Sequence, residues 1–185
     1  LVNCSNLASV SLPIVEQIDA FAFNGCSRLA SIYMPNVKSI GVNAFGRCSL
    51  LTELSLPYVT NIATSAFTNC SQLSQISIPN VSYIGGSAFA YTIISAISLP
   101  NISSLENVAF VSCSKLESVY IFTSYIPSVG NNVFRYTPLS DSSYLGYFGS
   151  IYVKESLADA FKSALRWSLY SARIVGLTDA EIAAL

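Results

Sequence analysis

The sequence predicts a solenoid, in which short coils of one chain stack along a common axis. The first observation is a fixed period, because cysteines recur every 22 residues and the series resumes after one interruption: Cys4, Cys26, Cys48, Cys70 and Cys113. The second is a proline series with nearly the same interval: Pro13, Pro35, Pro57, Pro79 and Pro100. The third is a small residue followed by Phe that closes each unit, from Ala22-Phe23 onwards. A period in the twenties is typical of stacked repeat arrays.

The first half of each unit predicts one short strand. A leucine three residues after the cysteine leads into it: Leu7, Leu29, Leu51, Leu73 and Leu116. Two apolar residues then alternate with polar ones, as Leu54 and Leu56 do, which is the period of a strand with one buried face. The proline that follows has no N–H to donate, so it ends the strand. Strands of successive units are expected to lie parallel, roughly 4.8 Å apart.

The second half of each unit supplies the other side of a shared core. A further apolar series leads to the closing Phe: Ile18, Ile40, Ile62, Ile84, Leu105 and Val129. A coil of this length cannot bury two apolar sides alone, so each coil depends on its neighbours. One unit departs from the pattern, because Thr92 replaces the cysteine, one residue is lost, and Ile94 takes the leucine position.

The consensus CSxLxxIxLPxVxxIGxxAF resembles the BspA-like class of leucine-rich repeats, found in surface proteins of host-associated bacteria and some protists. Residues 1–134 fit it through six coils, and CSQLSQISIPNVSYIGGSAF, from Cys70 to Phe89, is a close copy. The resemblance implies an α/β solenoid, a right-handed leucine-rich repeat superhelix with one short parallel strand per coil of about 22 residues and a C-terminal helical cap. Residues 150–177 resemble the family's usual ending of a strand of the type IYVP, a helix and a Trp-containing tail, with Lys154 where the family often has Pro.

We expect one domain in two parts. Residues 1–134 form the array, and residues 135–185 add an irregular loop, the last strand and the helical cap. Aligning Cys4 with Cys26 puts Leu1 at the position of Phe23, so the N-terminal end of the array is expected to be truncated.

The cap is predicted to hold two short helices. Ser156 and Asp159 suggest a loose capping box, after which apolar residues recur at helical spacing: Leu157, Phe161, Ala164 and Leu165. Trp167 is expected to pack on the last coil. Thr178 and Glu181 form a stronger capping box that opens a helix running to Leu185.

Composition excludes several classes of partner. The chain of 185 residues is 52% hydrophobic but 10% charged, where ordinary domains have about 25% charge. Its net charge of −1 and the lack of a Lys/Arg run argue against nucleic acid as a partner. No apolar stretch reaches the roughly 18 residues of a membrane span, so we expect no membrane insertion.

The residue types of common active sites are missing or scattered. There is no histidine, and no two acidic residues occupy corresponding places in adjacent coils. We therefore expect neither an enzyme nor a cofactor. The five cysteines share one inward position, so their Cβ vectors run parallel and buried free thiols are the favoured interpretation. An exterior location would permit disulfides, and zinc is disfavoured because CxxC pairs and histidine are both missing.

The outward strand residues form the candidate binding face, a run of short hydroxyls with tyrosines toward its two ends: Ser11, Tyr33, Glu53, Ser55, Gln75, Ser77, Ser98 and Tyr120. Repeat proteins bind partners along such extended surfaces, although serines could equally serve solubility alone. The loop at residues 135–149 offers further candidate contacts, Tyr136, Tyr144 and Tyr147. These tyrosines either bind a ligand or fold back over the last coil.

The resemblance implies an extracellular or cell-surface domain that binds host or neighbouring-cell surface proteins in an adhesive role. The alternatives are a passive spacer within a larger surface protein and a glycan-binding module. We also expect an end-to-end homodimer, because the N-terminal coil exposes an apolar face and an unpaired strand edge.

Overall fold

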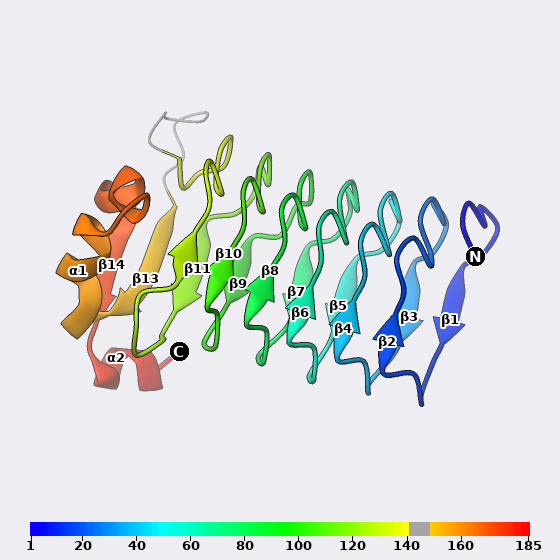
Figure 1. The fold of residues 1–185 in the computed structure, drawn as a ribbon, viewed down its shortest axis with the longest axis horizontal. Coiled ribbons are helices and arrows are strands. Elements are labelled where there is room, and N and C mark those ends of the chain that lie inside the picture. Colours follow the sequence, from blue (N-terminus) through cyan, green and yellow to red (C-terminus); the bar gives the residue numbers. More distant parts are fainter. Residues whose placement is uncertain (141–148) are drawn as a thin grey trace.

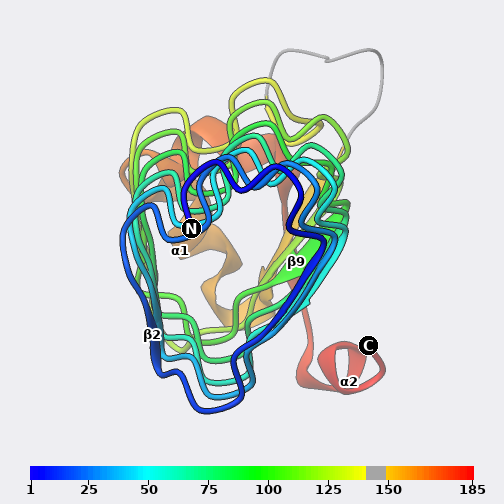
Figure 2. The same ribbon diagram turned by 90° about the vertical axis from the view of Figure 1, so that its right-hand side faces the viewer.

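The computed structural model describes residues 1–140 and 149–185 and shows a solenoid whose coils stack along one axis. The axis runs from the N-terminal coil to a group of helices at the far end (Figure 1). Viewed along the axis, successive coils follow nearly the same outline (Figure 2). The predicted α/β solenoid with a helical C-terminal region is therefore confirmed.

The first strand of each coil lies on one side of the solenoid, and we call these strands the odd row. Apolar residues such as Val10, Ile32 and Leu54 point inward and the residues on either side of each point outward, as the sequence alternation predicts. The members are β1 (Ser9–Ser11), β3 (Ser31–Tyr33), β5 (Glu53–Ser55), β7 (Gln75–Ser77), β9 (Ala96–Ser98), β11 (Ser118–Ile121) and β13 (Ser150–Lys154), with β14 (Ile174–Leu177) added at the C-terminal end. Hydrogen-bonded pairing follows the orders β1-β3, β5-β7 and β14-β13-β11-β9.

A second strand in each coil forms an even row on the opposite side, where Figure 2 labels β2 against β9. This row is one continuous parallel sheet: β2 (Gln17–Ile18), β4 (Ser39–Ile40), β6 (Asn61–Ile62), β8 (Tyr83–Ile84), β10 (Ser104–Leu105) and β12 (Ser128–Val129). The sequence predicts only one strand per coil. The second is two residues long and forms because main-chain groups on both sides of Ile40 pair between coils, with Lys38 N donating to Glu16 O at 2.7 Å and Gly41 N to Ile18 O at 2.8 Å.

A stack of phenylalanine rings runs through the core. The rings of Phe23, Phe45, Phe67, Phe89, Phe110 and Phe134 lie nearly parallel, with successive centroids 5.3–5.7 Å apart. The inner rings are fully buried, as are the leucines that follow the cysteines from Leu29 onwards. Ile94, in the leucine position of the irregular coil, is buried as predicted.

Two bends in each coil use left-handed backbone. One lies just before the cysteine position and the other just before the Ala-Phe pair, at residues such as Arg47 (φ 63°) and Asn43 (φ 52°). Asn and Ser tolerate this conformation, but a β-branched residue is strained by it. Val108 occupies the second bend of its coil with φ 53°.

The array continues beyond the six coils of the sequence analysis. Thr137 occupies the cysteine position and Leu139 the leucine position of a seventh coil, with the same spacing from Phe134 that Thr92 and Ile94 have from Phe89. Both side chains are fully buried, and Thr137 Oγ1 donates to Phe134 O at 2.7 Å. Residues 135–140 therefore belong to a coil, where the sequence predicts an irregular loop. The strand of this coil, β13, pairs in register with β11.

The C-terminal cap replaces the missing next coil with side chains. It comprises the 3₁₀ helix η1 (Glu155–Leu157), α1 (Ala158–Ser163), the 3₁₀ helix η2 (Trp167–Arg173), β14 and α2 (Asp179–Ala183). Trp167 is 1% exposed, which confirms its predicted core position, and its Nε1 donates to Pro127 O at 2.7 Å. Arg166 Nη1 donates to Val129 O at 3.2 Å, and the Tyr170 hydroxyl accepts from Phe134 N at 3.4 Å. In the other coils, backbone groups of the following coil make the equivalent hydrogen bonds.

Helix boundaries in the cap differ from the sequence expectation. The capping box at Ser156 and Asp159 is wrong, because Leu157 is the N-cap of α1 and makes no side-chain cap hydrogen bond. Helix α1 ends at Ser163, so Leu165 is 84% exposed instead of continuing the apolar face. The capping box of α2 is confirmed, although this helix ends at Ala183. Hydrogen bonds from Thr178 to the Glu181 carboxylate hold the pKa of that group below its ordinary value.

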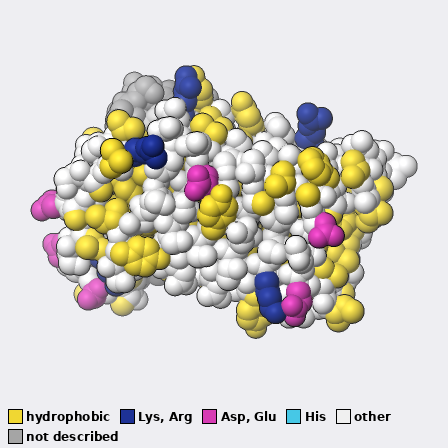
Figure 3. All heavy atoms as spheres, in the orientation of Figure 1, with side chains coloured by type: hydrophobic (Ala, Val, Ile, Leu, Met, Phe, Trp, Pro, Cys, Tyr) yellow, Lys and Arg dark blue, Asp and Glu magenta, His cyan; other side chains and the backbone are white. Residues whose placement is uncertain are grey.

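The N-terminal coil presents an apolar face. Leu7, Val10 and Leu12 are only partly buried, and Leu1 is 65% exposed. Hydrophobic side chains gather at this end of the molecule in Figure 3. The same positions in later coils contact the coil before them, as Ile32 does with Val10 through the pairing of β1 and β3.

We expect Phe67→Ala to lower the free energy of unfolding by roughly 3–5 kcal/mol, because it opens a cavity in a fully buried stack. Ser77→Ala, on the exposed outer face of β7, should change it by less than about 0.5 kcal/mol. Denaturant unfolding curves measure both values, and equal effects would contradict the assignment of inward and outward positions.

Val108→Asn should raise the free energy of unfolding by about 1 kcal/mol, because asparagine adopts left-handed backbone with less strain than valine. The matched control is Val111→Asn, since Val111 lies in the same coil, is also partly buried and does not have a positive φ. The control should be neutral or destabilising in the same thermal melts. A loss of stability in Val108→Asn would show that burial of the valine outweighs the strain.

Residues 1–185 on their own should self-associate through the first coil, because that coil exposes apolar side chains and an unpaired strand edge. Val10→Lys should shift the protein toward monomer in light scattering at high concentration. Ile93→Lys, a partly exposed apolar site in the middle of the array, should leave association unchanged. A strictly monomeric parent protein would refute this expectation.

Candidate binding face of the odd row

The outer face of the odd row carries two parallel lines of outward residues. One line is Ser9, Ser31, Glu53, Gln75, Ala96, Ser118 and Ser150, and the other is Ser11, Tyr33, Ser55, Ser77, Ser98, Tyr120 and Tyr152. Of the predicted site residues, Ser11, Tyr33, Glu53, Ser55, Gln75, Ser77 and Ser98 are all exposed here. The strand alternation positions them, because each inward neighbour belongs to the core.

Two hollows lie along this face. The larger, of about 640 Å³, crosses β3, β5 and β7 and has Ser31, Thr52, Glu53, Ser55, Gln75 and Ser77 on its rim, above Ile32, Leu54 and Ile76. The smaller, of about 150 Å³, continues past Ser77 to Ser98 and Pro100. Ile76 and Ser77 line both hollows. The two therefore form one shallow groove from the coil of β3 to the coil of β9, which we call the row groove.

Tyr120 lies one coil beyond the C-terminal end of the row groove, as the register partner of Ser98. Its ring stacks on that of Tyr152 in the next coil, with centroids 4.9 Å apart and planes 13° apart. Phe122 lies beside it at 6.0 Å, tilted by 54°. Tyr120 is consequently half-buried, unlike Tyr33 at the other end, which is 60% exposed.

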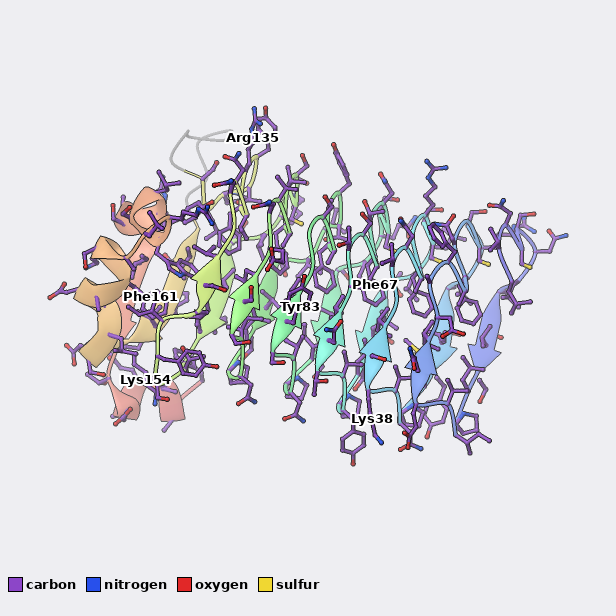
Figure 4. The ribbon with its side chains drawn as sticks, viewed as in Figure 1. Lys38, Phe67, Tyr83, Arg135, Lys154 and Phe161 are labelled. Carbon is purple, nitrogen blue, oxygen red and sulfur yellow. The ribbon has the colours of Figure 1, made fainter. Side chains whose placement is uncertain are left out.

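Tyr136, the loop tyrosine that the structure describes, is not brought to this face. Tyr136 is 45% exposed at the left-handed bend before Thr137, where the Arg135 guanidinium lies 4.5 Å from its ring centroid. Arg135 projects from the bend at the top of Figure 4, at the opposite end of the coil outline from Lys38. Tyr144 and Tyr147 lie outside the described residues.

The row groove has little charge. Glu53 is the one charged side chain among the residues that line its two hollows in the described structure. Lys38 pairs with Glu16 at 2.8 Å in the bend between the rows, where both side chains are exposed. Recognition in the row groove therefore depends on hydroxyl, amide and aromatic groups, which supply hydrogen bonds and apolar contact.

Sequence reasoning missed Tyr152 and Thr52. Tyr152 is the outward residue of IYV in β13 and is the register partner of Tyr120, so the strand alternation contained the signal. Thr52 precedes β5 and lines the larger hollow, which the alternation of the strand itself does not indicate.

Comparison with known proteins identifies the repeat. A family model described as the BspA type Leucine rich repeat region, in six copies, matches residues 1–117 and 38–154. The chain belongs to the BspA-type leucine-rich repeat family. No curated protein matches the chain.

Solved structures of bacterial leucine-rich repeat proteins resemble this BspA-type chain. The T. pallidum leucine-rich repeat protein TpLRR is 28% identical with a TM-score of 0.63, and the match covers 72% of this chain and 64% of that protein. A leucine rich cell surface protein from Faecalibacterium prausnitzii A2-165 is 22% identical with a TM-score of 0.48, covering 96% of this chain and 45% of that one. The BspA-type chain thus spans less than two thirds of either protein.

The cysteine ladder of this BspA-type array is structural. Cys26, Cys48, Cys70 and Cys113 are fully buried, as predicted, whereas Cys4 in the first coil is only partly buried. Each buried thiol donates to a main-chain carbonyl in the preceding coil, for example Cys70 Sγ to Phe45 O at 3.1 Å. Thr92 takes the same place in its coil and contacts Cys113 Sγ at 3.3 Å.

Burial keeps these thiols protonated. It raises the pKa of Cys48 from 9.0 to about 12, assisted by the neighbouring Cys26 and opposed by a hydrogen bond. It raises the pKa of Cys113 to about 11, against the lowering effect of hydrogen bonds with Thr92. A thiolate nucleophile or metal ligand is disfavoured at such sites. Among the described residues, no group of three or more Cys, Asp or Glu side chains could hold a metal ion.

None of the helices in the described part of the chain is long and apolar enough to cross a membrane.

In the native protein at pH 8, a thiol reagent should modify Cys4 rapidly and the four buried cysteines only after unfolding, because burial denies both access and ionisation. Mass spectrometry of the labelled protein identifies the sites. Native disulfides, or rapid labelling of Cys48 or Cys70, would contradict the structure.

The same burial predicts a loss of stability at high pH. A thiol with a raised pKa stays protonated in the folded state while the unfolded thiol ionises, so its contribution is complete below pH 9 and is lost toward pH 12. Cys48→Ala should therefore show a smaller fall in melting temperature between pH 8 and pH 11 than the parent protein. An identical fall in both proteins would contradict the raised pKa.

Proposed function

We propose that this chain is a non-catalytic recognition module of a secreted or cell-surface protein, and that it binds surface macromolecules of host or neighbouring cells in an adhesive role. The row groove is its binding site. Family membership supports a protein-interaction module, and the similar F. prausnitzii protein is described as a cell surface protein.

The row groove is the observation that carries this proposal. A passive spacer needs only a soluble outer surface, whereas the odd row is hollowed across three strands with hydroxyls, an amide and a carboxylate around apolar floor residues. Pockets of this kind, with apolar surface and a few convergent polar groups, are the usual binding sites of proteins. The side chains of Ser55 and Ser77, which border the hollow, are short and carry hydroxyls.

Binding to host-cell surface proteins should require the row groove. Ser77→Arg fills the groove from an exposed strand position and should weaken binding at least roughly tenfold in surface plasmon resonance. Asn61→Arg is the matched control, because Asn61 is an exposed strand residue on the even row. Equal binding by the two variants would place the site elsewhere, and a parent protein that binds no surface macromolecule would be a spacer.

A further inference from the structure

The stacking of Tyr120 covers one face of its ring. Its partner Tyr152 belongs to the next coil, and the two rings are nearly parallel at 4.9 Å. One face of the Tyr120 ring is therefore covered from the side of the next coil. On the other side lies Ser98, which is its register partner in β9 and is too small to cover an aromatic ring.

Tyr120 thus lies next in line beyond the row groove. From Tyr120 toward the N-terminus the same line of positions passes over Ser98, Ser77 and Ser55 to the exposed ring of Tyr33. Both hollows lie along this line. Tyr33 and Tyr120 are four coils apart, or roughly 19 Å at about 4.8 Å per step. Figure 1 shows the strands involved in succession, from β3 to β11.

These groups have the chemistry of a carbohydrate site. A sugar ring presents an apolar C–H face that packs on an aromatic face, and hydroxyls around its rim that both donate and accept hydrogen bonds. Tyr120 offers the aromatic face, and the rim of the groove offers Ser55, Ser77 and Ser98, whose hydroxyls also both donate and accept. Gln75 and Glu53 add amide and carboxylate groups from the neighbouring line.

The charge of the groove selects among carbohydrates. Neither hollow is lined by Lys or Arg, and Glu53 lines the larger one. Sialylated, sulfated or uronic acid chains would bring their negative charges to a site that holds no cation and one carboxylate. Neutral sugars, including N-acetylated ones, meet no such repulsion.

A polypeptide strand is the other candidate for this face. Peptides commonly bind sheets by adding a strand to an open edge, where main-chain groups are free. Main-chain pairing is present between β5 and β7, as in the hydrogen bond from Leu56 N to Ser77 O at 2.9 Å, but among the described strands it does not join β3 to β5 or β7 to β9. A peptide lying over β5 and β7 could therefore use side-chain contacts only.

We propose that the row groove binds a neutral oligosaccharide chain lying along the solenoid axis, with one sugar ring stacked on the free face of Tyr120 and the chain extending toward Tyr33. This inference rests on the proposed function and names the chemistry of its partner. The saccharide is carried either by a glycoprotein or by a free polysaccharide.

The test uses the whole chain on an array of neutral hexose and N-acetylhexosamine oligosaccharides, with sialylated and sulfated chains beside them, and calorimetry on those retained. Neutral chains should bind and anionic ones should not. Tyr120→Ala should weaken binding roughly two- to tenfold, the range of an aromatic contact, and Tyr120→Phe should retain it. Tyr58→Ala is the control, because Tyr58 is 57% exposed at a bend outside the groove. Thermal melts check that each variant is folded.

Chain length gives a second readout that loss of folding cannot mimic. Tyr33→Ala should weaken binding of long oligosaccharides but not of disaccharides, since a disaccharide on Tyr120 does not reach Tyr33. Ser77→Arg, which removes no contact of the core, should abolish binding of long chains. Binding unaffected by Tyr120→Ala and Ser77→Arg, or retention of anionic chains alone, would overturn the proposal.

The sources and the two proposals are separated in the same experiment. Intact glycoproteins, their enzymatically deglycosylated forms and free neutral polysaccharides are compared as ligands. Loss of binding on deglycosylation points to a glycoprotein, and binding of the polysaccharides alone to the second source. Binding that depends on Ser77 but survives deglycosylation overturns the saccharide inference and leaves the proposed function standing. No binding of any kind overturns both.

Discussion

Hydrogen bonds between neighbouring coils set the spacing on which the rest of the molecule depends. They run in both directions along the axis: Gly41 N donates to Ile18 O in the coil before, and Phe45 N donates to Ala66 O in the coil after. No coil satisfies its own main chain, so none is stable alone. This spacing between coils also sets the spacing of the phenylalanine rings, of the buried cysteines and of the outward residues. Features on different sides of the coil therefore keep the same register.

The inward half of this structure could be predicted because it repeats. The same positions are buried in each coil, so Cys, Leu, Ile and Phe recur at fixed intervals and show which side faces the core. The even row could not be found in the same way, since a strand of two residues such as Ser39–Ile40 has no alternation to detect. The seventh coil was concealed because Thr137 replaces the cysteine, although the spacing of Thr92 and Ile94 offered a precedent.

The candidate binding face could be predicted only in part from the sequence. Alternation identifies Glu53, Ser55 and Gln75 as outward, because their inward neighbours are bound to the core. It says nothing of depth, and only the structure shows the hollow above Ile32 and Ile76. It also treats Tyr33 and Tyr120 alike. Only the structure shows that Tyr33 is exposed and that Tyr120 is stacked on Tyr152.

Because of the way the cap ends the array, the number of coils can change without any change in the cap. Trp167, Arg166 and Tyr170 engage the last coils through the hydrogen bonds that another coil's main chain would make. The cap therefore contacts the array in the way that a further coil would, and any coil with this backbone geometry could precede it. Duplicating one unit in frame within the middle of the array would lengthen the row groove by a single step of roughly 4.8 Å while leaving the cap unaltered. In such a protein, the length of the binding site can increase by duplication of one repeat within the gene, without any new type of contact between coils.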